Sequence, residues 1–134
     1  MVAIQVEYAG DLHCRAVHDP SGTEFNTDAP KDNQGRGESF SPTDLVATAL
    51  GTCMLTTMGI LARTLGIDMA GATATVEKEM TPPPRRIGRL TVRIRMPRAL
   101  SAEDQLKLER AAHTCPVQKS IHPDVETPIT FTWG

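Results

Sequence analysis

The sequence has no concentrated charge of one sign. Its net charge is −2, and acidic and basic residues are spread along all 134 positions. Nucleic-acid binding needs clustered lysine and arginine, and the nearest basic run, Arg85, Arg86 and Arg89, follows three consecutive prolines. A solvated turn between strands explains that run better than a phosphate contact does. We therefore expect no nucleic-acid partner.

Export and membrane signals are also missing from the sequence. The chain does not open with a charged segment followed by an apolar one, which argues against a secretory signal. We also find no stretch approaching the ~20 apolar residues that cross a bilayer. These observations predict a cytoplasmic protein without a membrane partner.

Cysteine is scarce, and its number is odd. Cys14, Cys53 and Cys115 cannot form an even disulfide framework. In a reducing cytosol such thiols are more often buried structural residues, catalytic groups or metal ligands. A chain of this length can bury a core without disulfides, and we see no linker or internal repeat. We therefore predict a single domain over residues 1–134.

The N-terminal part of the chain predicts strands and then a loop. Apolar and polar residues alternate over 2–8 and again over 12–16, with the period of a half-buried strand. A short third strand is expected over 23–27. Residues 28–39 are rich in glycine and polar side chains, and a loop this long in a compact domain suggests a functional role.

A long helix is predicted to begin after Ser41. Ser41 can cap it, Pro42 suits the first helical position, and Asp44 completes a capping-box-like pair. The helix should continue to about Leu65, because Gly66 supplies a C-terminal stop.

This helix has no charged residue between Asp44 and Arg63. A helix without a polar stripe is buried on most sides, in a core or against another subunit. A chain this small can hardly surround such a helix alone, so we expect a homodimer.

The C-terminal half predicts a hairpin, a second helix and a closing strand. Alternating residues over 72–77 and 90–96 indicate two strands whose acidic and basic outer faces can pair across an antiparallel ladder. A second helix is expected over 101–113, a short turn after Cys115, and a last strand over 129–133. The predicted fold class is α+β, with antiparallel sheets and a long central buried helix.

Periodicity alone makes Cys53 a small core residue on the apolar face of its helix. Gly51 and Thr52 beside it are small, however, and would leave room for a reactant. Cys14 shares strand parity with Leu12 and Ala16, so we interpret it as a core residue.

Cys115 precedes Pro116, which suits the first position of a helical turn. A residue at a helix start faces unpaired N–H groups, and these stabilise a thiolate. Both cysteines could therefore react.

A peroxidase needs one thiolate to attack the O–O bond and a second thiol to condense with the sulfenic acid. Arg36 and Glu38, in the loop ahead of the Cys53 helix, could support the peroxide and the thiolate.

Two cysteine motifs carry a family resemblance. The block from Gly37 to Cys53 resembles the cysteine-bearing helix of the OsmC/Ohr family, and the block from His113 to Val117 resembles that family's second cysteine motif. Together with the order of elements, the resemblance covers essentially the whole chain. It implies an OsmC-like fold and an intertwined homodimer with two active sites at the subunit interface.

The resemblance also implies an activity. Organic hydroperoxides, with hydrogen peroxide as a further candidate, would be reduced by Cys53 as the attacking thiolate and Cys115 as the resolving thiol. A lipoyl-type or other dithiol would recycle the pair. We therefore assign Cys53, Cys115, Glu38 and Arg36 as catalytic residues, and we assign no cofactor and no metal ion.

The chain departs from the hydroperoxide reductases of this family in its supporting residues. They carry a glutamate directly after the helix-opening proline, where this chain has Thr43. Asp44 is rotated by about 100° around the helix from that position, so we interpret it as a cap. Arg15 and Arg36 are both candidates for the peroxide-orienting arginine. At one position where the family resemblance would place an arginine, this chain has Asp28. These differences indicate the OsmC-like branch.

Two other functions remain open from the sequence. A metal site could use His113, Cys115 and Cys53, joined by His13 or Cys14, although no CxxC pair or paired histidines at ligand spacing are present. Alternatively, the fold could bind an apolar or sulfur-containing small molecule with little peroxidase activity.

Overall fold

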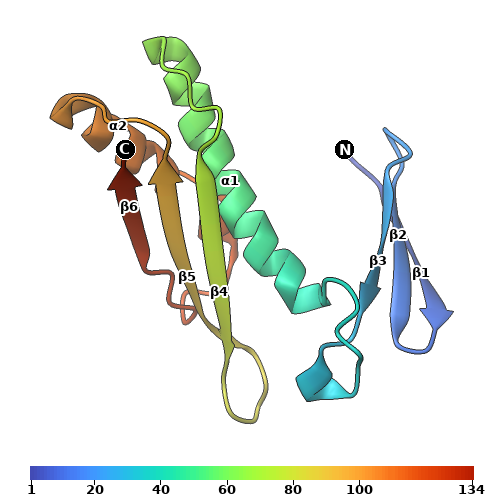
Figure 1. Cartoon of the computed structure of the whole chain (residues 1–134). Coiled ribbons are helices and arrows are strands. Elements are labelled where there is room, and N and C mark those ends of the chain that lie inside the picture. Colours follow the sequence, from blue (N-terminus) through green and yellow to red (C-terminus); the bar gives the residue numbers. More distant parts are fainter. The chain divides into compact units, whose positions relative to one another are not determined.

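The computed structural model describes residues 1–134, which form two compact units, Met1–Val46 and Ala47–Gly134. Figure 1 labels their strands and the helices α1 and α2. The assignment of the whole chain to a single domain stays a prediction.

The first unit contains a three-stranded antiparallel sheet in the order β1-β2-β3. Its strands are β1 (Ile4–Gly10), β2 (His13–His18) and β3 (Glu24–Asp28), close to the three predicted. Asp11 and Leu12, between β1 and β2, both have positive φ, which is the conformation of a two-residue hairpin turn whose twist matches that of the strands. A short 3-10 helix, η1 (Lys31–Asn33), follows in the predicted loop.

Little apolar surface is buried in the first unit. The alternating residues of β1, Ile4, Val6 and Tyr8, are exposed together with the polar residues between them. The strand prediction was correct, but the half-buried face that it implied stays open within one copy of the chain. Cys14, expected in the core, is only half-buried.

Helix α1 (Pro42–Leu65) begins and ends where the sequence predicts. The Ser41 hydroxyl accepts a hydrogen bond from the Asp44 amide at 3.1 Å, and the Asp44 carboxylate accepts one from the Ser41 amide at 2.9 Å. This reciprocal pair is a capping box. At the other end Gly66 has φ +70°, and the Ile67 amide donates to the Ala62 carbonyl at 2.8 Å. The helix therefore ends at a left-handed glycine.

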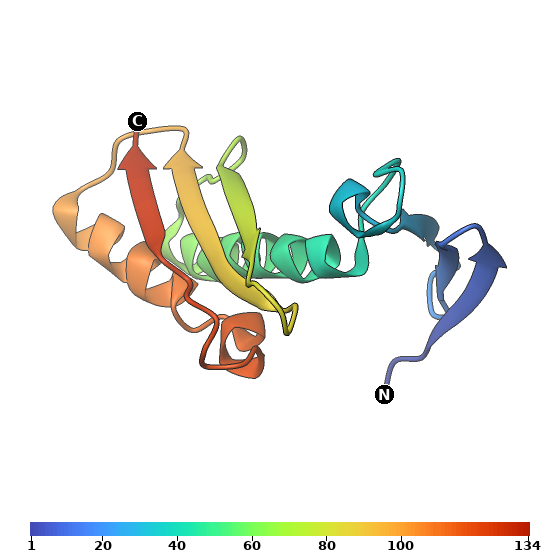
Figure 2. The ribbon, with the colours of Figure 1, turned by 90° about the horizontal axis from the view of Figure 1, so that it is seen from below.

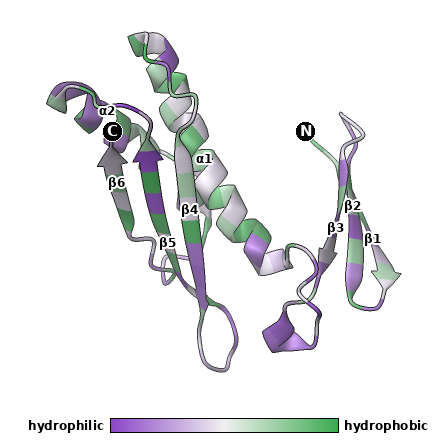
Figure 3. Cartoon of the chain, viewed as in Figure 1, coloured by the Kyte–Doolittle hydropathy of each residue, from purple (hydrophilic) through white to green (hydrophobic).

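The apolar character of α1 extends over most of its length (Figure 3). An 18-residue window of the helix has a mean hydropathy of 1.8, and about a third of it is buried. By length and composition this helix could cross a bilayer, so the expectation that no segment is long and apolar enough was wrong. Such a helix is weak support for a membrane protein, because core helices of soluble proteins meet the same criterion. The residues of α1 that one copy buries form a single stripe: Ala47, Leu50, Gly51, Met54, Met58 and Ala62.

The second unit is built on the sheet β4-β5-β6, with strands β4 (Thr73–Met80), β5 (Ile87–Met96) and β6 (Ile129–Trp133). β4 and β5 form the predicted antiparallel hairpin. β6 pairs with β5 in parallel, so the sheet is mixed and the expectation of purely antiparallel sheets was wrong. The reason lies in the connection from β5 to β6, which contains α2 (Ala102–Ala112) and α3 (Pro116–Ser120). A long crossover of this kind can return the chain to the same end of the sheet.

The core of the chain lies between this sheet and its helices. α1 and α2 cover one face of the sheet (Figure 2). Alternate residues of β5 are fully buried, namely Leu90, Val92, Ile94 and Met96. They are joined in the core by Leu50, Met54 and Met58 from α1 and Leu108 from α2. The outer residues of the hairpin form the cross-strand ion pairs that were expected, Arg93 with Glu77 and Arg89 with Glu79.

Candidate active site

Two of the three cysteines meet in the second unit. Cys53 lies in the middle of α1 and is half-buried, whereas Cys115 caps α3 and is fully buried. Their side chains are within hydrogen-bonding reach of one another, and both are free thiols. The structure therefore brings together the two residues that the sequence assigned as attacking and resolving cysteines.

Cys115 is positioned by the break between α2 and α3. Pro116 occupies the first position of α3, as predicted, and the Cys115 sulfur accepts a hydrogen bond from the Gln118 amide at 3.4 Å. The Gln118 side chain donates to the Thr127 hydroxyl at 3.1 Å, just ahead of β6. The first contact holds the thiol at the start of α3, and the second ties α3 to the segment ahead of β6.

The surroundings of Cys115 raise the pKa of its thiol. Burial is the largest cause, because it disfavours the charged form, and the neighbouring Cys53 side chain adds to the effect. The Gln118 N–H group at the start of α3 acts in the opposite direction but is outweighed. A helix start alone would have suggested a reactive thiolate at Cys115. In this structure the thiol keeps its proton at neutral pH, which suits a resolving residue.

The small residues beside Cys53 have other roles than the one expected. A Cβ atom on Gly51 would lie 2.8 Å from the Val76 side chain of β4, so this glycine permits close packing of the helix on the sheet. Thr52 is exposed, and its hydroxyl donates to the Thr48 carbonyl at 2.8 Å. The space at Gly51 is therefore filled by the sheet and is not open to a reactant.

Arg36 and Glu38 lie in the first unit, where they pair with each other. The Arg36 guanidinium donates to Glu38 Oε1 at 3.2 Å and to Asp11 Oδ2 at 2.7 Å. Arg15, the other candidate arginine, is paired with Glu24 at 2.6 Å. The role of Arg36 and Glu38 beside Cys53 stays a prediction. Asp44 is a helix cap, as the sequence indicated.

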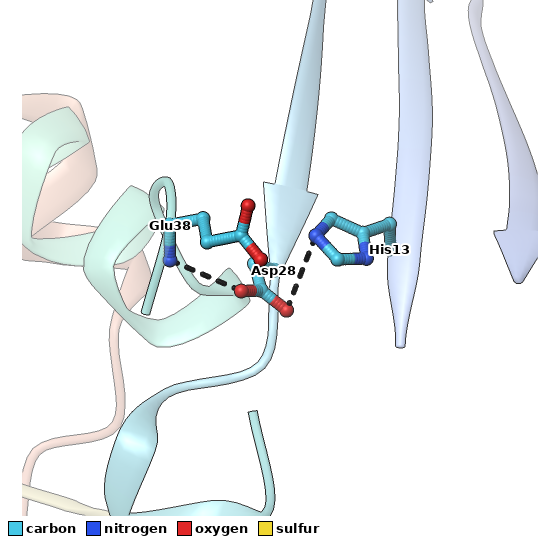
Figure 4. Close-up of side chains that lie close together, drawn as sticks. All are labelled: His13, Asp28 and Glu38. Atoms are coloured by element: carbon cyan, nitrogen blue, oxygen red, sulfur yellow. Dashed lines mark hydrogen bonds and ion pairs between the residues drawn. The ribbon is translucent and has the colours of Figure 1, made fainter. Parts of the chain in front are cut away.

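A polar cluster in the first unit was not predicted from the sequence. His13, Asp28 and Glu38 place their ligand atoms within 4.8 Å of one another (Figure 4). This is the group of possible metal ligands that the structure assembles, in place of the suggested set of His113, Cys115 and Cys53. Asp28 was predicted to begin the loop, but it ends β3 and lies opposite His13 in the register of β2 and β3. The sequence pattern did not determine how β2 and β3 align. The alignment seen in the structure is what places His13 beside Asp28.

Known proteins with similar sequences and structures point to the family that the two cysteine motifs resemble. Residues 35–130 match the family of OsmC-like proteins. A candidate osmotic stress induced and detoxification response protein from Psychrobacter arcticus is 48% identical, with a TM-score of 0.93, and the match covers 98% of this chain and 96% of that one. No match was found among curated proteins.

More distant structures share the fold. The organic hydroperoxide resistance protein OsmC from Legionella pneumophila is 15% identical, with a TM-score of 0.77 and coverage of 98% of this chain and 96% of that one. The organic hydroperoxide resistance protein OhrB of Bacillus subtilis is 17% identical, with a TM-score of 0.72 and coverage of 98% of both chains. With the α+β order of elements, the mixed sheet and the match over most of its length, this chain belongs to the OsmC-like family.

Proposed function

We propose that the protein is a thiol-dependent peroxidase that reduces organic hydroperoxides, and to a lesser extent hydrogen peroxide, through Cys53 and Cys115. The observation that carries this proposal is the contact between a half-buried and a fully buried cysteine in one compact unit. The names of the Legionella and Bacillus proteins, both organic hydroperoxide resistance proteins, support it.

The reaction divides into three steps. The Cys53 thiolate attacks the O–O bond of the hydroperoxide and takes one oxygen as a sulfenic acid, while the alkoxide leaves and is protonated to the alcohol. The Cys115 thiol then attacks the sulfenic sulfur, which forms the disulfide and releases water. A dithiol reduces this disulfide by two exchange steps and leaves as its own disulfide.

The difference between the two cysteines sets their roles. Cys53 is the more accessible sulfur, and an incoming peroxide must reach the attacking atom. Cys115 is buried and its pKa is raised, so at neutral pH it holds a proton. A protonated thiol beside Cys53 can donate a hydrogen bond to the Cys53 thiolate, which stabilises that thiolate.

Arg36 and Glu38 are proposed as the charged support of the reaction. A guanidinium can hold the peroxide oxygens, and a carboxylate paired with it keeps the guanidinium in place. Their mutual ion pair supplies that arrangement in the first unit. Thr43 has no carboxylate, so Glu38 is the acidic residue that we assign to this role.

We also propose that the active form is a homodimer in the cytoplasm. One copy leaves the apolar residues of β1 and Ile60 of α1 exposed, and a second copy would cover such surface. In the cytoplasm, dithiols keep the cysteine pair reduced between turnovers.

The proposal is tested with a panel of organic hydroperoxides and hydrogen peroxide, recycled by dihydrolipoamide. Cys53→Ser should lower the rate of peroxide consumption by roughly a thousandfold or more, because it removes the nucleophile. Cys14→Ser is the matched control and should keep the wild-type rate. A wild-type protein that consumes no peroxide in the panel would contradict the proposal and favour a small-molecule binding protein.

A further inference from the structure

A second polar site lies in the first unit. His13 from β2 and Asp28 from β3 face each other, and Glu38 approaches from the loop ahead of α1 (Figure 4). The Glu38 backbone N–H donates to Asp28 Oδ2 at 3.0 Å. One nitrogen and two carboxylate groups therefore converge within 4.8 Å from three separate segments.

Asp28 is the best buried charged residue of the chain, with 1% of its surface exposed. Its Oδ2 atom accepts the Glu38 N–H, but its Oδ1 atom is buried without a hydrogen-bond donor. In the cluster, His13 Nε2 lies 3.5 Å from Oδ1. A buried carboxylate oxygen without a partner is costly, so a positive group is expected at this point.

The ring of His13 is oriented toward this oxygen by its other nitrogen. His13 Nδ1 lies 2.7 Å from the Asp11 carbonyl oxygen. A carbonyl only accepts hydrogen bonds, so Nδ1 carries the proton, and in the neutral ring Nε2 has a bare lone pair. That lone pair faces Asp28 Oδ1. Two lone pairs at this separation need a cation or a second ring proton between them.

Glu38 can join these ligands without losing its ion pair. Glu38 Oε1 accepts from Arg36, and a carboxylate has a second oxygen that can bind a cation. The two carboxylates repel each other across the cluster unless positive charge lies between them. A divalent ion balances both.

We propose that His13 Nε2, Asp28 Oδ1 and a Glu38 oxygen bind a divalent transition-metal ion, with zinc preferred. A histidine that donates its Nδ1–H to a backbone carbonyl and presents Nε2 has the arrangement of a metal ligand. Ligands about 2.0–2.1 Å from a tetrahedral zinc ion lie about 3.3–3.4 Å apart, close to the 3.5 Å between Nε2 and Oδ1. Imidazole with carboxylates suits zinc, which binds such sites more tightly than manganese.

The site shares Glu38 with the proposed peroxidase machinery, but zinc binding is measured without peroxide and does not depend on the proposed activity. Its ion would tie β2, β3 and the segment 29–39 together. Three protein ligands leave one tetrahedral position for water or an exogenous anion.

The test is a zinc titration by calorimetry on full-length Cys53→Ser/Cys115→Ser protein stripped with a chelator, so that the thiols do not compete for zinc. One zinc ion per chain should bind and raise the melting temperature. Asp28→Asn, His13→Gln and Glu38→Gln, each added to this background, should weaken binding by about a hundredfold or more. His18→Gln, at the other end of β2, is the matched control and should bind normally.

Two results would overturn the inference. One is the absence of zinc binding in the double cysteine variant with an unchanged circular dichroism spectrum, which would make the cluster an ion pair between Asp28 and a protonated His13. The other is equal zinc affinity in the background protein and in folded His13→Gln. His13 is half-buried, so His13→Gln keeps the inference testable if Asp28→Asn fails to fold.

Discussion

The two units of the chain differ in what they bury. The second unit holds every buried apolar residue except Ala16, including the inner face of β5 and the stripe of α1. The first unit buries mainly polar groups, Thr27, Asp28 and Ser41, and leaves the apolar residues of β1 exposed. The second unit therefore has a conventional core, whereas the first has a sheet with polar contacts at one end.

This contrast separates two kinds of site. In the second unit, burial acts on a neutral thiol, raises its pKa and leaves it protonated beside Cys53. In the first unit, burial acts on a carboxylate that stays charged, because N–H groups and His13 hold the pKa of Asp28 below its usual value despite burial. The environment in the second unit suits cysteine chemistry. The environment in the first unit suits a bound cation.

After the loss of the Cys53 nucleophile itself, the largest effect should come from the resolving cysteine. Cys115→Ser should still react once with peroxide and accumulate a sulfenic acid at Cys53, because the nucleophile is intact. Steady turnover with a dithiol should fall by about a hundredfold, since no intramolecular disulfide forms. A sulfenic-acid probe with mass spectrometry measures the first outcome. Rapid reaction of Cys53→Ser with sulfenic acid at Cys115 would reverse the two roles.

The core of the second unit should be sensitive to truncation. Met54 is fully buried, whereas Leu106 of α2 is 47% exposed. Met54→Ala should lower the free energy of unfolding by about 2–5 kcal/mol, because it leaves a cavity. Leu106→Ala is the control, and its effect should be under about 1 kcal/mol. Urea denaturation measures both, and equal losses would argue against the assigned core.

The exposed apolar face of the first unit should matter only in the dimer. Val6→Glu places a charge among the exposed apolar residues of β1. It should raise the dimer dissociation constant by about tenfold or more if a second copy covers that face. Sedimentation of the wild type and of Glu7→Gln, a control on the opposite face, measures this. If the wild type is a monomer at micromolar concentration, both the proposed homodimer and the expected active sites at its interface are contradicted.

The smallest effect is a pH dependence that comes from Cys115. Its folded pKa is raised above the ordinary value of 9.0, so the unfolded chain releases the thiol proton first as pH rises. The free energy of unfolding should be unaffected well below pH 9 and should fall as pH rises through the folded pKa. Cys115→Ser should flatten this decline and Cys14→Ser should keep it. An increase in stability over that range would contradict the raised pKa.

Local signals allowed much of the fold to be predicted. The capping box of Ser41 and Asp44 and the left-handed Gly66 fix the ends of α1, because each depends on residues within one turn. The Ser101 cap of α2 and the start of α3 after Cys115 are local in the same sense.

Long-range features were the ones that the sequence left undetermined. The direction of β6 depends on where the crossover returns the chain, and no residue in β6 encodes it. The pairing of His13 with Asp28 depends on strand register. Gly51 looked like open space beside Cys53, because its contact with Val76 comes from a strand that follows much later in the sequence. Cys53 and Cys115 were paired by family resemblance, since helical periodicity alone favoured a core role for Cys53.

The most direct measurement is the identity of the disulfide that forms on oxidation. The reduced protein is treated with one equivalent of organic hydroperoxide, its remaining thiols are alkylated, and its peptides are mapped without reduction. The account predicts one intramolecular bond between Cys53 and Cys115, with Cys14 alkylated, because the two paired thiols lie within hydrogen-bonding reach in the reduced protein. A major disulfide that contains Cys14, or oxidation that leaves Cys53 as a free thiol, would contradict it.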